Sequence, residues 1–82
     1  MKLIISTPSS YREISVAWLE FNAPTGNYVI QQGHAPMIMT LVPNQKLIFR
    51  LKSGKEESIL IRQGMVTIDR DETTAILTEQ EA

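Results

Sequence analysis

The feature that most constrains the fold is a repeated alternation of short apolar runs with turn-forming residues. The turn signals recur every ~8–12 residues, a spacing typical of an all-β sandwich or barrel. No stretch carries the sustained i, i+3, i+4 apolar stripe of an amphipathic helix. The pattern therefore predicts an all-β chain, a small antiparallel β-sandwich of about eight to ten short strands. The segments expected to form strands are 2–7, 13–21, 28–30, 37–42, 45–52, 57–62, 65–69 and 73–78.

Two hairpins are expected in the second half of the chain. Residues 45–52 alternate between apolar and polar side chains, Ser53-Gly54 supplies a turn, and 57–62 form the return strand. Gln63-Gly64 is interpreted as a break between the hairpins, after which 65–69 pair with 73–78.

The segment 13–21 also alternates with a period of two. A regular strand there places Ile14, Val16 and Trp18 on one face and Leu19 on the opposite face.

The amino-acid composition excludes several classes of function. The chain has 82 residues, enough for one small domain, which we expect to span residues 1–82. Eight basic and nine acidic residues give a net charge of −1, without the basic excess of a nucleic-acid-binding protein. There is no cysteine, which excludes disulfides, thiol catalysis and thiolate zinc sites. No apolar run suits a signal peptide or a membrane span, so we expect a soluble chain that reaches a membrane only through a partner.

The search for catalytic or metal-binding residues returns none. The single histidine, His34, has no cysteine or recognisable nucleophile to pair with, and no cluster of histidine and carboxylate residues has metal-ligand spacing. The acidic residues at 56–57 and 69–72 adjoin predicted turns and are interpreted as solvated charges. The sequence predicts a non-enzyme without cofactor or metal.

The stretch from Gly33 to Pro43 joins a glycine, the lone histidine, a nearly unbroken apolar run and two prolines. His34 either fastens a tight turn or contacts a partner. The cluster Met37–Met39 is either core or a protein interface, since methionine adapts to partner surfaces. Alternation puts Met37 and Met39 on one face and Ile38 on the other, and leaves open which face points outward.

These residues belong to an ordered set of motifs that resembles the N-terminal β-sandwich domain of the epsilon subunit of F-type ATP synthases. The set runs through the whole chain: Leu3-Ile4-Ile5-Ser6-Thr7-Pro8, Ala23-Pro24-Thr25-Gly26, Gly33-His34-Ala35-Pro36, Leu41-Val42-Pro43-Asn44, Gly64-Met65-Val66 and Thr74-Ala75-Ile76-Leu77.

The chain also departs from the family pattern. Val29 and Gln63 stand where the family has glycine, and Asn44 replaces the glycine that follows Pro43. Family members commonly continue into a C-terminal helical hairpin, and this sequence ends at Ala82 without one. Either the chain is naturally short or it is truncated, and the inhibitory and nucleotide-binding roles of that hairpin are not carried over.

The resemblance implies a non-catalytic rotor subunit of the central stalk that links the gamma subunit to the membrane c-ring and couples ion flow to ATP synthesis. Its place would be peripheral, at the cytoplasmic face of a bacterial plasma membrane. The rival hypotheses are a generic β-sandwich interaction module, a small nucleic-acid-binding barrel and an enzyme, and near-neutral charge argues against the second.

The resemblance also implies site residues. The residues matching the gamma contact are His34, Met37, Met39 and Thr40, and those matching the c-ring contact are Thr25, Gly26 and Asn27. The residues expected to shape turns are Gly33, Pro36, Pro43, Asn44 and Gly64.

Overall fold

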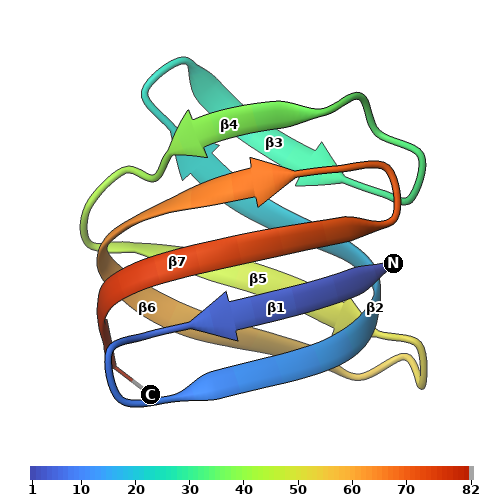
Figure 1. Cartoon of the computed structure of the whole chain (residues 1–82), viewed down its shortest axis with the longest axis horizontal. Helices are drawn as coiled ribbons and strands as arrows, with labels where there is room; N and C mark the ends of the chain where they lie inside the picture. Colours follow the sequence, from blue (N-terminus) through green and yellow to red (C-terminus); the bar gives the residue numbers. More distant parts are fainter. Residues whose placement is uncertain (82) are drawn as a thin grey trace.

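The computed structural model describes the backbone of residues 1–81 and the side chains of residues 1–78, so the predicted domain end at Ala82 lies outside it. The described residues form seven strands and no helix (Figure 1). The strands are β1 (Lys2–Ser6), β2 (Tyr11–Ala23), β3 (Gly26–Ile30), β4 (Met37–Thr40), β5 (Gln45–Leu51), β6 (Glu56–Ile68) and β7 (Glu72–Glu81).

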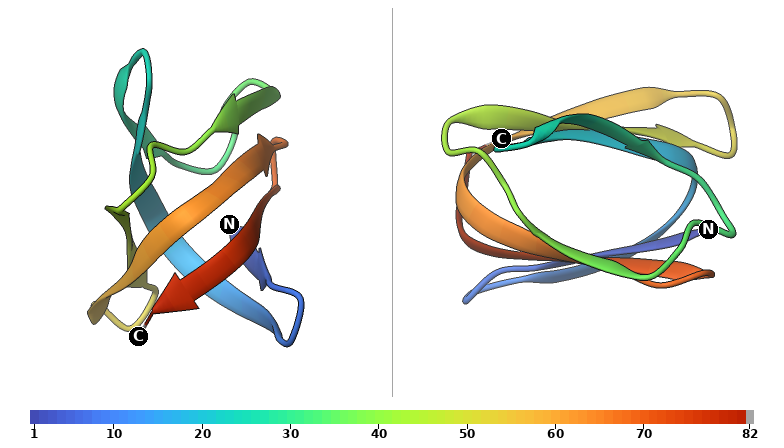
Figure 2. Two further views of the ribbon diagram at one scale, coloured as in Figure 1. Left: turned by 90° about the vertical axis from the view of Figure 1, so that its left-hand side faces the viewer. Right: turned by 90° about the horizontal axis from the view of Figure 1, so that it is seen from above.

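The strands form two layers that share two long strands (Figure 2). Strands β2 and β6 have 13 residues each, and each passes from one layer to the other. Sheet I contains β3, the C-terminal half of β2, β5 and the N-terminal half of β6. Sheet II contains β4, the C-terminal half of β6, β7, β1 and the N-terminal half of β2. The predicted β-sandwich is confirmed, with one parallel pair, β1 with β7, among antiparallel ones.

There are fewer strands than predicted because Gly64 does not end one. The predicted strands 57–62 and 65–69 are a single strand, β6, and the prediction that Gly64 shapes a turn is wrong. The pairing of β6 with β7 shifts register on both sides of Gln63, as at a β-bulge. A Cβ on Gly64 would lie 2.6 Å from Leu77 Cδ2 and 2.7 Å from the Ile76 carbonyl oxygen. The glycine is needed for the close approach of β7.

A second irregularity, in β2, reverses the predicted faces of Trp18 and Leu19. The pairing of β2 with β5 shifts register between Val16 and Trp18. Val16 and Leu19 are both buried, three positions apart, while Trp18 is half-buried. The prediction that Trp18 shares a face with Val16 is therefore wrong, because one extra residue inverts the alternation.

The core lies between the two sheets and is almost entirely aliphatic and aromatic. Thr73 is the only buried polar residue among those described, and its hydroxyl donates to the Met1 sulfur at 3.6 Å. The largest fully buried side chains are those of Phe21, Phe49, Leu3, Ile5, Leu19, Ile30, Leu47, Ile61, Ile68, Leu77, Val16 and Val66. Stability rests on this apolar burial, since the described chain contains no disulfide.

Candidate docking surfaces

The outer face of sheet II is apolar or hydroxylated and carries no charge over its central part. We call the residues Ile38, Thr40, Met65, Thr67, Thr74 and Ile76 the sheet II face. Strand pairing aligns them in two rows, Thr40–Met65–Ile76 and Ile38–Thr67–Thr74. Ile38, Ile76 and Met65 are 69%, 48% and 38% exposed. Apolar side chains gathered on one exposed face indicate an interaction surface.

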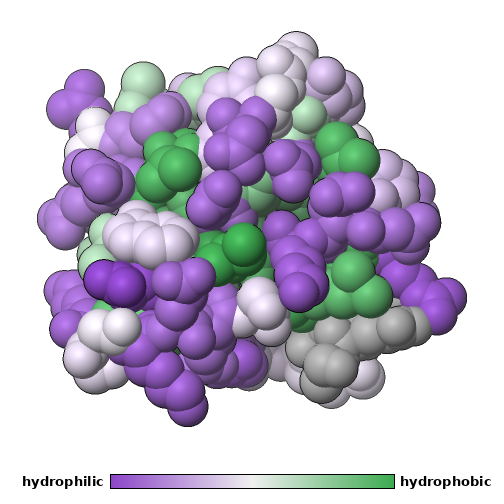
Figure 3. Space-filling view, turned by 180° about the vertical axis from the view of Figure 1, so that it is seen from behind, coloured by the Kyte–Doolittle hydropathy of each residue, from purple (hydrophilic) through white to green (hydrophobic). Residues whose placement is uncertain are grey.

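The outer face of sheet I differs. Seen from behind in Figure 3, it is mainly hydrophilic, with apolar side chains scattered among polar ones. Arg50, Lys46 and Val29 are exposed there, and the partly buried Trp18 lies beside Arg50 across the strand pair. Scattered single apolar residues are normal on a protein surface.

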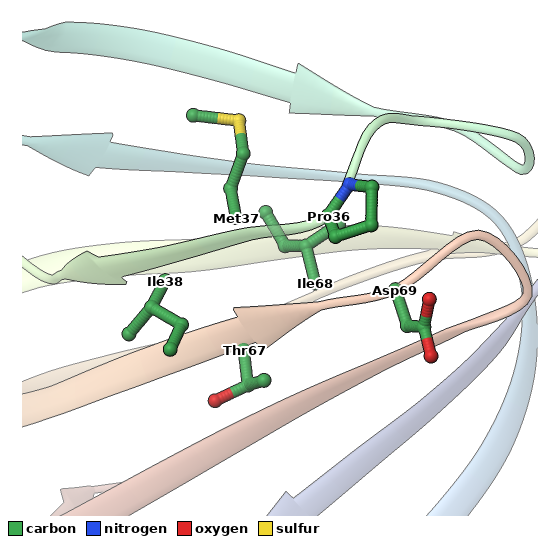
Figure 4. A pocket seen from close by; sticks show the side chains of 6 residues that line it. All are labelled: Pro36, Met37, Ile38, Thr67, Ile68 and Asp69. Carbon is green, nitrogen blue, oxygen red and sulfur yellow. The ribbon is translucent and has the colours of Figure 1, made fainter.

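Strand β4 shows which side of the predicted Met-Ile-Met cluster points outward. Met37 and Met39 are half-buried and pack against the core, whereas Ile38 is exposed. Figure 4 shows Met37 pointing toward β3 while Ile38 points the opposite way, to the side of Thr67. The same residues border a hollow of about 540 Å³ that Pro36, Ile68 and Asp69 complete. Ile38, rather than either methionine, is the side chain that β4 offers to the sheet II face.

A second hollow, of about 440 Å³, lies between β4 and the end of the β2–β3 hairpin. We call it the β3–β4 groove. Its lining residues are Ala23, Pro24, Thr25, Tyr28, Met37, Ile38, Met39 and Thr40. The structure thus brings Thr25, from the predicted c-ring set, next to Met37, Met39 and Thr40, from the predicted gamma set.

The turn at the end of the β2–β3 hairpin holds the predicted residues Thr25, Gly26 and Asn27, all exposed. Gly26 has φ +139°, which favours glycine. The Asn27 amide donates to Glu20 Oε2 at 3.1 Å and to Asn22 Oδ1 at 3.2 Å. Thr25 Oγ1 lies 2.7 Å from the Tyr28 hydroxyl. These contacts fix the turn, which projects from the body of the sandwich (Figure 2).

The loop before β4 contains Gly33, His34 and Pro36. Gly33 has φ +87°, and its N–H donates to the Arg70 carbonyl at 2.7 Å, which ties the loop to the β6–β7 turn. The half-buried His34 has its Nδ1 at 2.8 Å from the Ala35 carbonyl oxygen. The loop after β4 turns at Pro43 and Asn44, with Asn44 at φ 62°.

Charged residues stand at one end of the sheet II face. The Lys2 ammonium lies 2.9 Å from Glu13 and 3.6 Å from Glu72. The hydrogen bond between Lys2 and Glu13 raises the pKa of Lys2 and lowers the pKa of Glu13. All three side chains are about half exposed, so water screens these pairs and they contribute little to stability.

Within residues 1–78 no group of three or more histidine, cysteine or acidic side chains could hold a metal ion. The part of the chain that the structure describes also has no helix able to span a bilayer.

Residues 1–81 match the family described as "ATP synthase, Delta/Epsilon chain, beta-sandwich domain". The chain belongs to this family. The match covers all seven strands, so the fold and the family agree over the described residues. The ordered motifs singled out in the sequence therefore identify its family correctly.

Two solved structures show the same fold. A chain from the mitochondrial ATP synthase of Euglena gracilis, solved with OSCP, F1 and the c-ring, superposes with a TM-score of 0.88 at 17% identity, over 96% of this chain and 51% of that one. A chain from the central stalk and c-ring of the Tetrahymena thermophila mitochondrial ATP synthase gives 0.84 at 16% identity, over 99% of this chain and 65% of that one. The chain thus spans only about half to two thirds of the length of these solved chains.

The gamma set expected from the sequence contains Thr40 but none of the three exposed apolar residues of the sheet II face, Ile38, Met65 and Ile76, although the cluster Met37–Met39 was considered as either core or interface. Period-two alternation identifies which residues share a side of a strand, but not which side faces the core. Counting apolar residues on both sides of 65–69 and 73–78 was the available signal, since Met65 and Ile76 are apolar on the outer side.

Proposed function

We propose that this chain is a non-catalytic subunit of the central stalk of a rotary ATP synthase. In this role it links the gamma subunit to the membrane c-ring and transmits torque between ion flow and ATP synthesis. The observation that carries the proposal is the family match over residues 1–81. The uncharged sheet II face supports it, because a stalk subunit needs a side that fits a protein partner.

The proposed gamma contact is centred on the sheet II face. Of the four residues first expected there, Thr40 belongs to that face, and His34 lies in the loop that leads into β4. Met37 and Met39 contribute from the β3–β4 groove, where flexible thioether side chains adapt to a partner. Ile38 joins this set as its most exposed apolar member, with Met65 and Ile76 beside it.

The proposed c-ring contact is the turn Thr25-Gly26-Asn27. Its support is the projection of the hairpin and the hydrogen bonds that hold its shape (Figure 2). A turn whose shape is already fixed loses little conformational entropy on docking. Such a subunit acts at the surface of the energy-transducing membrane, and in a bacterium this is the cytoplasmic face of the plasma membrane.

The gamma contact is tested by titrating the cognate gamma subunit in a calorimeter with two matched variants. Ile76→Asp places a carboxylate on the sheet II face, and Val29→Asp places one on the outer face of sheet I. The parent side chains are 48% and 51% exposed, so neither change disturbs the core. We expect Ile76→Asp to weaken binding by about tenfold or more, since ~1.4 kcal/mol corresponds to a factor of ten. Equal effects of both variants, or no binding by the wild type, would contradict the assignment.

The c-ring contact is tested by cross-linking, which the absence of native cysteine makes specific. Thr25→Cys is expected to form a cross-link to the c-ring in the reconstituted complex. Ser53→Cys, in the turn between β5 and β6 at the other end of the sandwich, is the control (Figure 1). A cross-link from the control but not from the β2–β3 turn would reverse the proposed orientation.

A further inference from the structure

Strand β4 has an open edge. It pairs only with β6, and β3 pairs only with β2, within the part of the chain that the structure describes. These two strands follow one another in sequence yet do not pair with each other, and they lie apart in Figure 2. The other strands belong to the closed series β1-β7-β6-β5-β2, which returns to β1.

The main-chain groups at this edge can be assigned from the ladder with β6. The Leu41 N–H donates to the Gly64 carbonyl at 2.9 Å, which continues the register of β4 with β6. In an antiparallel pair the hydrogen-bonded residues alternate. The peptide groups of Met37 and Met39 therefore face β6, whereas those of Ile38 and Thr40 face the open side.

Proteins usually protect such an edge with a lysine, another charge, a proline or a covering loop. The four residues of β4, Met-Ile-Met-Thr, are uncharged and include no proline. The neighbouring strand β3, Gly-Asn-Tyr-Val-Ile, is uncharged as well. Between Pro36, which precedes β4, and Val42, whose N–H donates to the Asn22 carbonyl at 2.9 Å, the edge thus lacks the charges and prolines that normally prevent another strand from pairing there.

The β3–β4 groove lies beside this edge and suits the side chains of an added strand. Tyr28, Met37 and Met39 are partly buried there and pack against the core. No residue that lines the groove is charged. An extended segment with uncharged, apolar side chains pointing into the groove would match this lining, and a charged one would lose its hydration there.

We infer that the gamma subunit places an extended, uncharged segment along β4 and pairs with its open edge as an added strand. The segment needs about four residues to match β4. The inference rests on the proposed function. We assign the added strand to gamma because Ile38 belongs both to the sheet II face, which is the proposed gamma contact, and to the groove lining. A partner that covers the face therefore reaches the edge.

The test separates main-chain pairing from side-chain contact at one position. Ile38→Ala removes the exposed side chain and keeps the amide, whereas Ile38→Pro removes the amide as well. That amide points away from β6, and proline is tolerated on an edge strand in this orientation. We expect Ile38→Pro to bind gamma about tenfold more weakly than Ile38→Ala, because the partner's carbonyl loses its donor. Equal affinities for the two variants would overturn the inference.

Amide hydrogen exchange of the wild type keeps the test decisive if Ile38→Pro fails to fold. Saturating gamma should slow exchange of the Ile38 and Thr40 amides by at least about tenfold, as new main-chain hydrogen bonds form. The amide of Val29, in strand β3, serves as the reference. Unchanged exchange at Thr40 in the bound chain would overturn the inference.

Failure of this inference differs from failure of the proposed function. A wild-type chain that does not bind gamma refutes both. Gamma binding with equal Ile38→Ala and Ile38→Pro affinities refutes only the added strand. A dimer of the free chain, seen by sedimentation and abolished by Ile38→Pro, would assign the edge to a second copy and overturn the choice of gamma.

Discussion

Gly64→Ala tests whether the fold depends on the close approach of β6 and β7 at residue 64. An ideal Cβ at residue 64 meets Leu77 Cδ2 at 2.6 Å, the Ile76 carbonyl oxygen at 2.7 Å and Leu77 Cα at 3.3 Å. The first atom can move by a side-chain rotation, but the other two belong to the backbone of β7. The added methyl group therefore has to push the two strands apart.

The magnitude follows from two opposing effects. Overpacking of this kind costs about 1–3 kcal/mol. Replacing glycine by alanine returns about 0.4–1 kcal/mol by restricting the unfolded chain. We expect a net loss of about 1–2 kcal/mol. For a domain of this size, this lowers the melting temperature by roughly 5–15 °C.

The assay is urea unfolding of Gly64→Ala, Leu77→Ala and the double variant. Leu77 is 2% exposed, so Leu77→Ala alone should cost about 2–5 kcal/mol. It also removes the Cδ2 atom that the new methyl group meets. The double variant should therefore lose at least about 0.5 kcal/mol less than the sum of the single changes.

Gly54→Ala is the control, because a Cβ there meets nothing within 4 Å and its cost comes only from φ +99°. Leu77→Ala should leave that cost unchanged. A Gly64→Ala variant that is as stable as the wild type, or strict additivity with Leu77→Ala, would refute the close-approach explanation.

Three further predictions concern the core, a turn and an exposed ion pair. Phe49→Ala, in the fully buried centre, should cost about 3–5 kcal/mol in urea unfolding. Asn44→Gly should be nearly neutral in thermal unfolding, whereas Asn44→Ala should cost about 1–2 kcal/mol, because φ is 62° there. The pKa of Glu13 is lowered by its ion pair with Lys2. The small stabilisation from this pair is therefore present above the ordinary Glu13 pKa of 4.5, and it is lost as pH falls through the folded-state pKa. Glu13→Gln should remove this part of the acid dependence in a pH series of urea midpoints, and an unchanged series would contradict the ion pair's role.

Local sequence patterns predicted the β-sandwich because strand alternation and turn formation depend mainly on residues that are close in the sequence. Alternation in residues 45–52 and the Ser53-Gly54 turn predicted β5 and its pairing with β6, and that hairpin is present. Asn44 is expected from the sequence to shape a turn, and it does so with φ 62°, a conformation that asparagine tolerates because of its own short polar side chain.

The predictions that were wrong depended on contacts between distant segments. Gly64 looks like a turn residue in the sequence, but the approach of Leu77 in β7 explains its presence. Trp18 was placed on the wrong face, because a bulge formed against β5 shifts the register of β2. No local window contains either partner strand.

The sequence by itself determined an all-β domain of the ATP synthase delta/epsilon family with a net charge of only −1, since residue type, alternation and motif order are properties of the chain. Only the tertiary structure decided that Ile38 points outward while Met37 and Met39 turn inward, and that β4 keeps an open edge. The physical reason is that alternation defines two faces of a strand, but burial of one face is settled by which strands pack against it. The same packing leaves β3 and β4 without a common ladder, and so creates the edge and groove to which we assign the partner strand.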